Sequence, residues 1–192
     1  MNHISNVPIT GILVANRGEI ASRVFRTARS MGLRCVAVYV DADTAAPYVV
    51  EADVAVRLDD GGYLDGDALV AAAKAAGADA VHPGYGFLAE NAAFAIAVAD
   101  AGLTWIGPTP DVIASMGDKI SAKVAALAAG VPTLPFSYYP FDEDAVGYPL
   151  LVKAAAGGGG KGMHLVERPE DLAGAVATAQ REAAASFGDD RV

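Results

Sequence analysis

Apolar and polar positions in the first 110 residues follow two alternating periods. Short stretches that are apolar, or that alternate between apolar and polar, predict strands; they cover residues 9–15, 35–40, 52–58, 80–82 and 103–106. Between them, apolar residues recur at helical spacing, which predicts helices over 20–28, 67–76 and 91–101. Strands that alternate with helices form a parallel sheet with helices on its faces. We therefore expect a doubly wound α/β domain over residues 1–110.

A different pattern begins after the Gly-Pro-Thr-Pro run at 107–110, which we interpret as a domain boundary. Short helices are predicted over 111–116 and 119–129, and a stretch rich in proline and aromatic residues follows. Two strands, 150–154 and 163–166, flank a glycine loop, and a helix follows over 169–187. The second region, 111–192, is therefore expected to be α+β with a hairpin around the glycines. Its last residues resemble the approach to a further strand, so we expect this domain to be incomplete.

Composition narrows the possible partners and compartments. The chain has 192 residues with a net charge of −9, and 53% of them are hydrophobic and 19% charged, as in core-forming domains. The acidic balance argues against non-specific nucleic-acid binding, which needs clustered cations. A single cysteine, Cys35, excludes an intrachain disulfide and suits a reducing compartment. No apolar run is long enough to span a membrane and no signal peptide is evident. We expect a cytoplasmic protein with neither nucleic acid nor a membrane as partner.

Glycines dominate the loop between the two strands of the second region. The loop consists of Gly157, Gly158, Gly159, Gly160, Lys161 and Gly162, and Met163 follows it. Glycines expose backbone N–H groups without side-chain obstruction, and such amides beside a lysine suit a phosphate. The loop is not a Walker A motif, because Ala155 fills the first glycine position and Gly162 follows the lysine. The alternative is a flexible linker.

Two further lysines stand near predicted element ends. Lys153 lies in an otherwise apolar strand, where a lysine is rarely buried without an anionic partner. It is either a phosphate ligand beside the glycine loop or a residue on the solvent face of an edge strand. Lys119 follows Asp118 at a predicted helix start, where Asp118 is a candidate N-cap. A phosphate role for Lys119 is compatible with that cap.

The loop from His82 to Asn91 follows a strand and precedes a helix. In a doubly wound sheet, ligands bind at the carboxyl ends of the strands. The candidate pocket residues here are His82, Gly84, Tyr85, Gly86 and Phe87. The alternative is a structural turn with aromatic packing. Without a second histidine or a cysteine nearby, His82 does not indicate a metal site.

The first strand-to-helix turn is Asn16-Arg17-Gly18-Glu19-Ile20. A nicotinamide enzyme would show G-x-G-x-x-G at this turn, but only one glycine is present. Arg17 and Glu19 could pair with each other or face a partner. The alternative is a helix start with solvated charges.

Together these segments resemble the biotin carboxylase family, the ATP-grasp component of acetyl-, propionyl- and other acyl-CoA carboxylases and of pyruvate carboxylase. The matching segments are ILVANRGEIASRVFRTAR, HPGYGFLAEN, WIGP, MGDKISAK, AGVP and GYPLLVKAAAGGGGKGM. ANRGEIA together with HPGYGF is specific to this family, whereas the glycine loop alone indicates only an ATP-grasp ligase. The resemblance implies that residues 1–110 are the Rossmann-like N-terminal domain and that residues 111–192 open the ATP-grasp domain.

The resemblance also implies roles for particular residues. Lys119 and Lys153 would contact the phosphates of ATP, the loop from Gly157 to Gly162 would cover them with backbone amides, and Met163 would lie near the adenine. The loop from His82 to Phe87 would line the bicarbonate and biotin pocket. Arg23 and Arg26 would lie near a homodimer contact of the full-length protein.

The implied reaction activates bicarbonate with ATP and passes the carboxyl group to biotin on a carrier protein, with a carboxyltransferase subunit as the next partner. Mg²⁺ is implied as well, but in relatives its acidic ligands, the general base and a biotin-facing arginine lie beyond the matched stretch. No catalytic residue and no metal ligand is therefore assigned to this chain.

The sequence departs from its relatives in two places: Ala89 replaces a usual serine, and the segment from Pro132 to Gly147 is short. We expect this chain alone to turn over no ATP. The alternatives are half of a split ATP-grasp ligase and a non-catalytic binding or regulatory module.

Overall fold

A computed structural model describes residues 8–59, 61–138, 140–156 and 162–192. The chain forms two compact units, one up to Ala114 and one from Ser115. The sequence predicts a boundary at 110, and α5 (Pro110–Gly117) runs through both positions. Each unit is described separately below.

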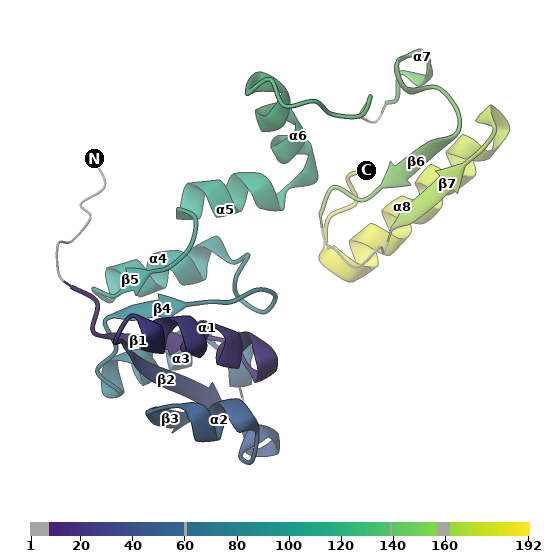
Figure 1. Ribbon diagram of the computed structural model, residues 1–192. Helices are drawn as coiled ribbons and strands as arrows, with labels where there is room; N and C mark the ends of the chain where they lie inside the picture. The colour runs from purple at the N-terminus through teal and green to yellow at the C-terminus, as the bar shows by residue number, and fades with distance from the viewer. Residues whose placement is uncertain (1–7, 60, 139, 157–161) are drawn as a thin grey trace. The chain divides into compact units, whose positions relative to one another are not determined.

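The N-terminal unit is built on a five-stranded parallel sheet in the order β3-β2-β1-β4-β5 (Figure 1). The strands are β1 (Gly11–Val14), β2 (Arg34–Tyr39), β3 (Val54–Arg57), β4 (Ala80–His82) and β5 (Thr104–Trp105). β1 lies between β2 and β4 and pairs in parallel with both, with Val14 opposite Ala37 on one side and His82 on the other. The chain therefore reverses its direction across the sheet between β1 and β4, which creates a switch point at their carboxyl ends.

Helices cover both faces of this sheet, because side chains along a strand alternate between the faces. Ile12 and Val14 of β1 pack in a cluster with Phe25 of α1 (Gly18–Ser30) and Tyr48 of α2 (Pro47–Glu51). Leu13 packs in a second cluster, on the opposite face, with residues of α3 (Gly66–Ala75) and α4 (Ala92–Asp100). The doubly wound architecture predicted from the sequence is confirmed.

Three short elements of the N-terminal unit differ from the prediction. The helix α2 and the short 3₁₀ turns Asp41–Asp43 and Gly62–Leu64 are not predicted by the apolar pattern. All three are at most five residues long, which is too short for a helical period to show. The structure confirms Cys35 as a small, fully buried core residue.

The C-terminal unit contains a helical part and a hairpin. Its elements are the end of α5, α6 (Lys119–Ala128), α7 (Glu143–Val146), β6 (Leu150–Lys153), β7 (Met163–Val166), a 3₁₀ turn (Pro169–Asp171) and α8 (Leu172–Phe187). β6 and β7 pair antiparallel, as predicted, with Lys153 opposite Met163. Val152 and Val166 pack against Val176 of α8, so one face of the hairpin is covered by this helix. The alternation along β6 turns Lys153 to the other face.

The described helices include none whose length and apolar character would suffice to cross a lipid bilayer.

Candidate functional site

The loop after β4 is fixed to the first strand-to-helix turn by Asn16. The backbone N–H of Ala15 donates to the carbonyl of His82 at 2.8 Å. The side-chain amide of Asn16, which is fully buried, donates to the carbonyls of Pro83 and Tyr85, both at 2.8 Å. One side-chain amide therefore donates to two carbonyls that take part in no strand pairing. Asn16 therefore joins the two loops at the switch point, a role that the sequence analysis did not assign to it.

Gly84 allows this close approach. Its φ is +67°, and a Cβ at this position would lie 2.6 Å from Cγ2 of Ile20 and 2.8 Å from Nδ2 of Asn16. Only glycine satisfies both the left-handed backbone and the available space.

A pocket of about 270 Å³ lies between the two loops. Its lining residues are Arg17, Gly18, Glu19, Ile20, Tyr85, Gly86 and Phe87. The structure thus brings the predicted residues Tyr85, Gly86 and Phe87 to a pocket, and the Tyr85 hydroxyl donates to Oε1 of Glu19 at 3.4 Å. His82 and Gly84 do not line this pocket; they shape the loop that carries the lining residues.

Nδ1 of His82 accepts a hydrogen bond from the backbone N–H of Gly84 at 2.9 Å. A protonated imidazole would turn a second N–H toward that donor, so the geometry requires the neutral ring. Burial lowers the pKa of His82 below its ordinary value of 6.5. His82 is therefore a structural residue of the loop in its neutral form.

This state of His82 predicts a pH dependence of stability. Because the pKa is lower in the folded than in the unfolded chain, the unfolded chain binds more protons below about pH 6.5. The contribution of neutral His82 to the unfolding free energy is complete above pH 6.5 and is lost as the pH falls toward the lowered pKa of His82. We expect the unfolding free energy, followed by the fluorescence of Trp105, to decrease between pH 7.5 and 5.5. His82→Asn, which retains a hydrogen-bond acceptor, should make this slope shallower; an unchanged slope would contradict the assignment.

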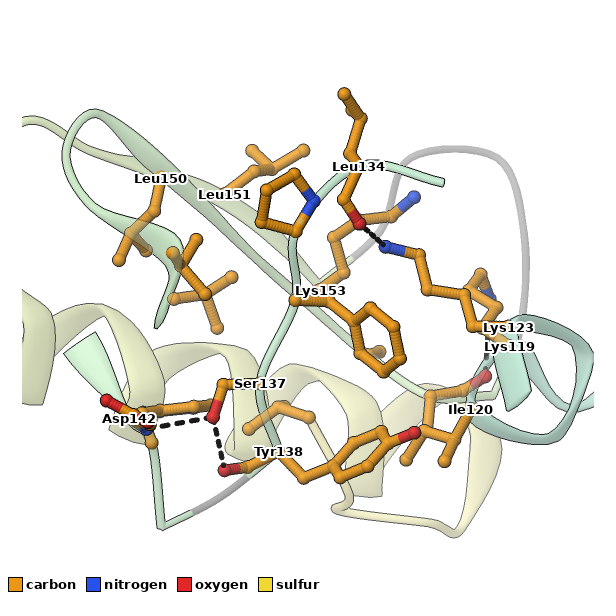
Figure 2. Close-up of a pocket in the computed structure, with 18 of the residues that line it drawn as sticks. Lys119, Ile120, Lys123, Leu134, Ser137, Tyr138, Asp142, Leu150, Leu151 and Lys153 are labelled. Carbon is orange, nitrogen blue, oxygen red and sulfur yellow. Dashed lines mark hydrogen bonds between the residues drawn. The ribbon is translucent and has the colours of Figure 1, made fainter. Parts of the chain in front are cut away.

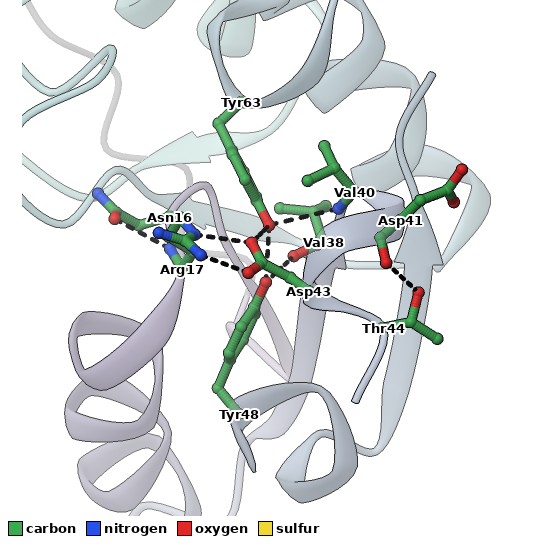
Figure 3. A network of polar contacts seen from close by, with 9 residues as sticks. All are labelled: Asn16, Arg17, Val38, Val40, Asp41, Asp43, Thr44, Tyr48 and Tyr63. Atoms are coloured by element: carbon green, nitrogen blue, oxygen red, sulfur yellow. Dashed lines mark hydrogen bonds and ion pairs between the residues drawn. The ribbon is translucent and has the colours of Figure 1, made fainter. Parts of the chain in front are cut away.

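Arg17 does not pair with Glu19, one of the interpretations that the sequence left open. Its Nε donates to Oδ2 of Asp43 at 2.7 Å and its Nη2 donates to Oδ1 (Figure 3). The hydroxyl of Tyr63 also donates to Asp43 and lies 2.8 Å from the hydroxyl of Tyr48. The Arg17 guanidinium lowers the pKa of Asp43 against the opposing effect of burial. The carboxylate is thus ionised, buried and fully bonded.

The second candidate site is a cavity of about 740 Å³ inside the C-terminal unit (Figure 2). Lys119 and Lys153, which the sequence predicts as phosphate ligands, both line it, and so does Lys123, which the sequence analysis missed. Most of the remaining lining is apolar or aromatic and comes from Leu134, Pro135, Phe136, Tyr138, Phe141, Val146, Pro149, Leu150, Leu151, Val152 and Leu172. A cavity with cations and an extended apolar lining suits a ligand with a flat apolar part and an anionic part.

Lys119 is placed by the start of α6. Its backbone N–H donates to the carbonyl of Ala155 at 3.2 Å, and its Nζ lies 3.5 Å from the same oxygen. The carboxylate of Asp118 accepts from the backbone N–H of Ser121 at 2.8 Å, which confirms Asp118 as the N-cap. Lys119 is therefore held beside the residue that leads from β6 into the glycine loop.

The Asp118 cap predicts a loss of stability on substitution. Asp118→Ala leaves a backbone donor at the start of α6 without its partner and should cost about 1 kcal/mol of unfolding free energy. Asp118→Asn keeps an acceptor and should cost only a few tenths. Urea unfolding followed by far-UV circular dichroism measures both. Equal losses in the two variants would mean that the surface ion pair of Asp118 with Arg191, 2.9 Å long, is the larger contribution.

Lys123 is held by an aromatic ring and a carbonyl. Its Nζ lies 4.4 Å from the ring centroid of Phe136 and donates to the carbonyl of Leu134 at 3.3 Å. Lys119 and Lys123 lie together in the cavity, away from Leu150 (Figure 2). A lysine four residues after Lys119 on the same helix face was the signal that could have identified it.

The residues around the glycine loop are described at its two ends only. Gly162 has φ +66°, accepts a hydrogen bond from Ala154 at 3.0 Å, and leaves room for the Ala154 side chain, which would lie 3.1 Å from an added Cβ. Met163 follows opposite Lys153, is exposed and is not among the residues that line the cavity. The other predicted loop residues, Gly157, Gly158, Gly159, Gly160 and Lys161, lie outside the described residues.

A doubly wound parallel sheet, followed by a hairpin around a glycine loop beside two lysines, defines the class as ATP-grasp. Residues 8–113 match the biotin carboxylase N-terminal domain, and residues 118–192 match the carbamoyl-phosphate synthase L chain ATP binding domain. The chain belongs to the biotin carboxylase family, as the sequence motifs predict.

Individual relatives agree with this assignment. The alpha subunit of mitochondrial methylcrotonoyl-CoA carboxylase from Oryza sativa is 53% identical over 92% of this chain and 26% of its own length. Biotin carboxylase from Halalkalibacterium halodurans is 46% identical over 93% of this chain and 42% of its own. A Campylobacter jejuni biotin carboxylase–β-γ-ATP complex superposes with a TM-score of 0.88 at 40% identity, over 96% of this chain and 44% of its own. The chain thus spans between a quarter and a half of these relatives.

Proposed function

We propose that this chain supplies the N-terminal domain and the start of the ATP-grasp domain, 1–110 and 111–192, of a biotin carboxylase. The reaction is the ATP- and bicarbonate-dependent carboxylation of biotin on a carrier protein. The observation that carries the proposal is the convergence of Lys119 and Lys153 on one largely apolar cavity, which Ala154 and Ala155, directly after β6, also line. Relatives described as biotin carboxylases in complex with ATP, or with MgADP and bicarbonate, support it.

The cavity suits the nucleotide. Lys119 and Lys153 would neutralise the phosphates, whose charge shifts as the γ-phosphoryl group is transferred. Backbone amides of Gly157, Gly158, Gly159, Gly160 and Gly162, with the cation of Lys161, would cover the phosphates. Met163 and the apolar lining would hold the adenine. For Lys119 and Lys153 these roles rest on their position at the cavity. For the glycine loop and Met163 they rest on residue type and on the family motif.

The reaction proceeds in two steps. A bicarbonate oxygen attacks the γ-phosphorus, ADP leaves, and carboxyphosphate forms. N1′ of biotin, after losing its proton, attacks the carboxyl carbon, and inorganic phosphate leaves. We propose that the pocket between Arg17–Ile20 and Tyr85–Phe87 receives part of the bicarbonate or biotin. The partly buried His82 and Gly84, joined by a hydrogen bond of 2.9 Å, would hold its rim.

Mg²⁺, when bound, would supply positive charge that neutralises the phosphates of the nucleotide. No group of three or more His, Cys, Asp or Glu side chains gathers within the part of the chain that the structure describes. The family resemblance implies that the acidic ligands of Mg²⁺ lie beyond the matched stretch, so we propose no Mg²⁺ ligand in residues 1–192.

The partners follow from the same reaction. They are a biotin carboxyl carrier protein or domain and a carboxyltransferase subunit, which selects the acyl-CoA; acetyl-CoA is one candidate. Arg23 and Arg26, on α1, are proposed for a homodimer contact of the full-length protein. A cytoplasmic location stays a prediction, since relatives include mitochondrial carboxylase subunits by name.

A chimeric enzyme tests this function. Residues 8–192 replace the matching residues of Halalkalibacterium halodurans biotin carboxylase, and ADP release is measured with and without bicarbonate and free biotin. Release that depends on both substrates supports the proposal. A folded chimera that binds ADP but shows no such release would favour the non-catalytic binding module instead.

A further inference from the structure

Among the residues that the structure describes, Phe87 is the only one other than glycine with a left-handed backbone; its φ is +40°. It lines the pocket of the N-terminal unit. For a bulky residue this conformation is strained and persists only where neighbours hold it. The ring of Phe87 stacks on that of Tyr63, with centroids 5.3 Å apart and an interplanar angle of 15°. The Tyr63 ring is therefore the contact that holds Phe87.

Tyr63 is in turn fixed at its hydroxyl group. The hydroxyl donates to Asp43 and accepts from the backbone N–H of Val40 at 3.3 Å. The hydroxyl of Tyr48 lies 2.8 Å from that of Tyr63 and 3.1 Å from the carbonyl of Val38, and it shares its one proton between these two acceptors. The ring of Tyr63 consequently has little freedom to rotate or withdraw from Phe87.

The network needs a cation, and Arg17 supplies it. Asp43 is 6% exposed, and an ionised carboxylate at this depth requires a paired charge. Arg17 donates hydrogen bonds to both carboxylate oxygens of Asp43, and its Cζ lies 5.9 Å from the ring centroid of Tyr63. The planar guanidinium of an arginine matches the two oxygens of a carboxylate with two parallel donors, and the ammonium group of a lysine does not. Arg17 lines the pocket, yet its charge is already engaged.

We propose that Arg17 is a positioning residue: acting through Asp43 and Tyr63, it holds Phe87 in the left-handed conformation and so fixes the Tyr85–Phe87 rim of the pocket. Its role is not to bind the anionic substrate. That the rim faces bicarbonate or biotin rests on the proposed function; the positioning itself does not.

Amide hydrogen exchange of the 192-residue chain tests the proposal. The reporter is the peptide 83–91, in which the N–H of Ala89 donates to the carbonyl of Gly86 across Phe87 at 2.9 Å. Arg17→Ala would leave Asp43 buried and unpaired and could unfold the unit. We therefore use Arg17→Met with Asp43→Leu, which removes both charges. Exchange in 83–91 should rise about tenfold while that of β1 stays unchanged.

A control pair of substitutions at another ion pair and a Phe87→Gly background complete the test. Arg57→Met with Asp41→Leu removes an exposed ion pair, 2.6 Å long, and should leave 83–91 unchanged. In a Phe87→Gly background the Arg17/Asp43 substitutions should cause no additional rise, because the residue through which they act is gone. An equal rise in that background, a rise throughout the unit, or no rise at all would overturn the proposal.

The chimera adds the functional readout. Arg17→Met with Asp43→Leu should raise KM for free biotin or bicarbonate and leave KM for ATP unchanged. A rise in KM for ATP would contradict a role confined to the rim. If the unsubstituted chimera is inactive, the proposed function fails, while the exchange result still decides the positioning role.

Discussion

Replacing Lys153 by alanine is expected to lower kcat/KM for ATP in the chimera between about 100-fold and 1000-fold. Lys153 lies on the face of β6 opposite the helix that covers the hairpin, and it lines the cavity together with Lys119. Lys153 is exposed; its cation would stabilise charge on the transferred phosphoryl group far more than one in bulk water once the bound nucleotide excludes water from the cavity. The rate of ADP release as a function of ATP concentration measures this loss.

Two variants serve as controls for Lys153→Ala. Arg168→Ala removes an exposed cation of the same unit that pairs with Asp171 and Glu170 at the surface and does not line the cavity; its rate should be unchanged. Lys153→Arg keeps the charge and should retain more activity than alanine. If Lys153→Ala and Arg168→Ala have the same rate, Lys153 belongs to the solvent face of an edge strand, as the alternative interpretation of the sequence has it.

Replacing Gly84 by alanine is expected to cost about 3 kcal/mol of unfolding free energy in the N-terminal unit. A left-handed backbone costs an L-residue about 1–2 kcal/mol. The added methyl group would also overlap Ile20 and Asn16, at 2.6 and 2.8 Å, and overpacking adds about 1–3 kcal/mol. Neither neighbour can withdraw easily, since Asn16 is buried and bonded to two carbonyls. Urea unfolding followed by the fluorescence of Trp105 measures the cost.

Gly86 is the matched control for Gly84. It lies two residues further along the same loop with a similar φ of +69°, but an added Cβ would meet nothing within 4 Å. Gly86→Ala should therefore cost only the backbone contribution of about 1–2 kcal/mol. The difference between the two variants isolates the contact of the loop with the first turn. Equal costs would mean that Asn16 and Ile20 move aside without penalty.

The parallel sheet was predictable because its signals are local. The apolar stretches of β1, β2 and β4 are buried on both faces, and a glycine follows each of the helices α1, α3 and α4 within two residues. The helix α2 was not predictable in this way. Its buried residue is Tyr48, whose hydroxyl group lies within hydrogen-bond distance of the Val38 carbonyl and the Tyr63 hydroxyl. Contacts of this kind join separate elements and leave no period in the sequence.

The candidate sites were likewise predictable from the sequence only in part. The position of the loop after β4 followed from its motif and from the rule that ligands bind at the carboxyl ends of parallel strands. The Arg17–Asp43–Tyr63 network did not follow, because its members are 26 and 20 residues apart and single charges usually lie in solvent. One signal was present: Arg17 and Asp43 come shortly after β1 and β2, whose carboxyl ends lie at the same edge of the sheet.

The sequence by itself determined the α/β class and the family, and it named Lys119, Lys153 and the Tyr85–Phe87 loop as candidates, because periodicity, glycine placement and charged residues in apolar stretches are local features of the chain. Only the tertiary structure decided that Arg17 bonds Asp43 and not Glu19, that Asn16 joins two loops, and that Lys123 joins Lys119 and Lys153 at one cavity. The physical reason is that burial and partner choice are properties of three-dimensional packing. A charge is solvated or paired according to what the fold brings within hydrogen-bond distance of it.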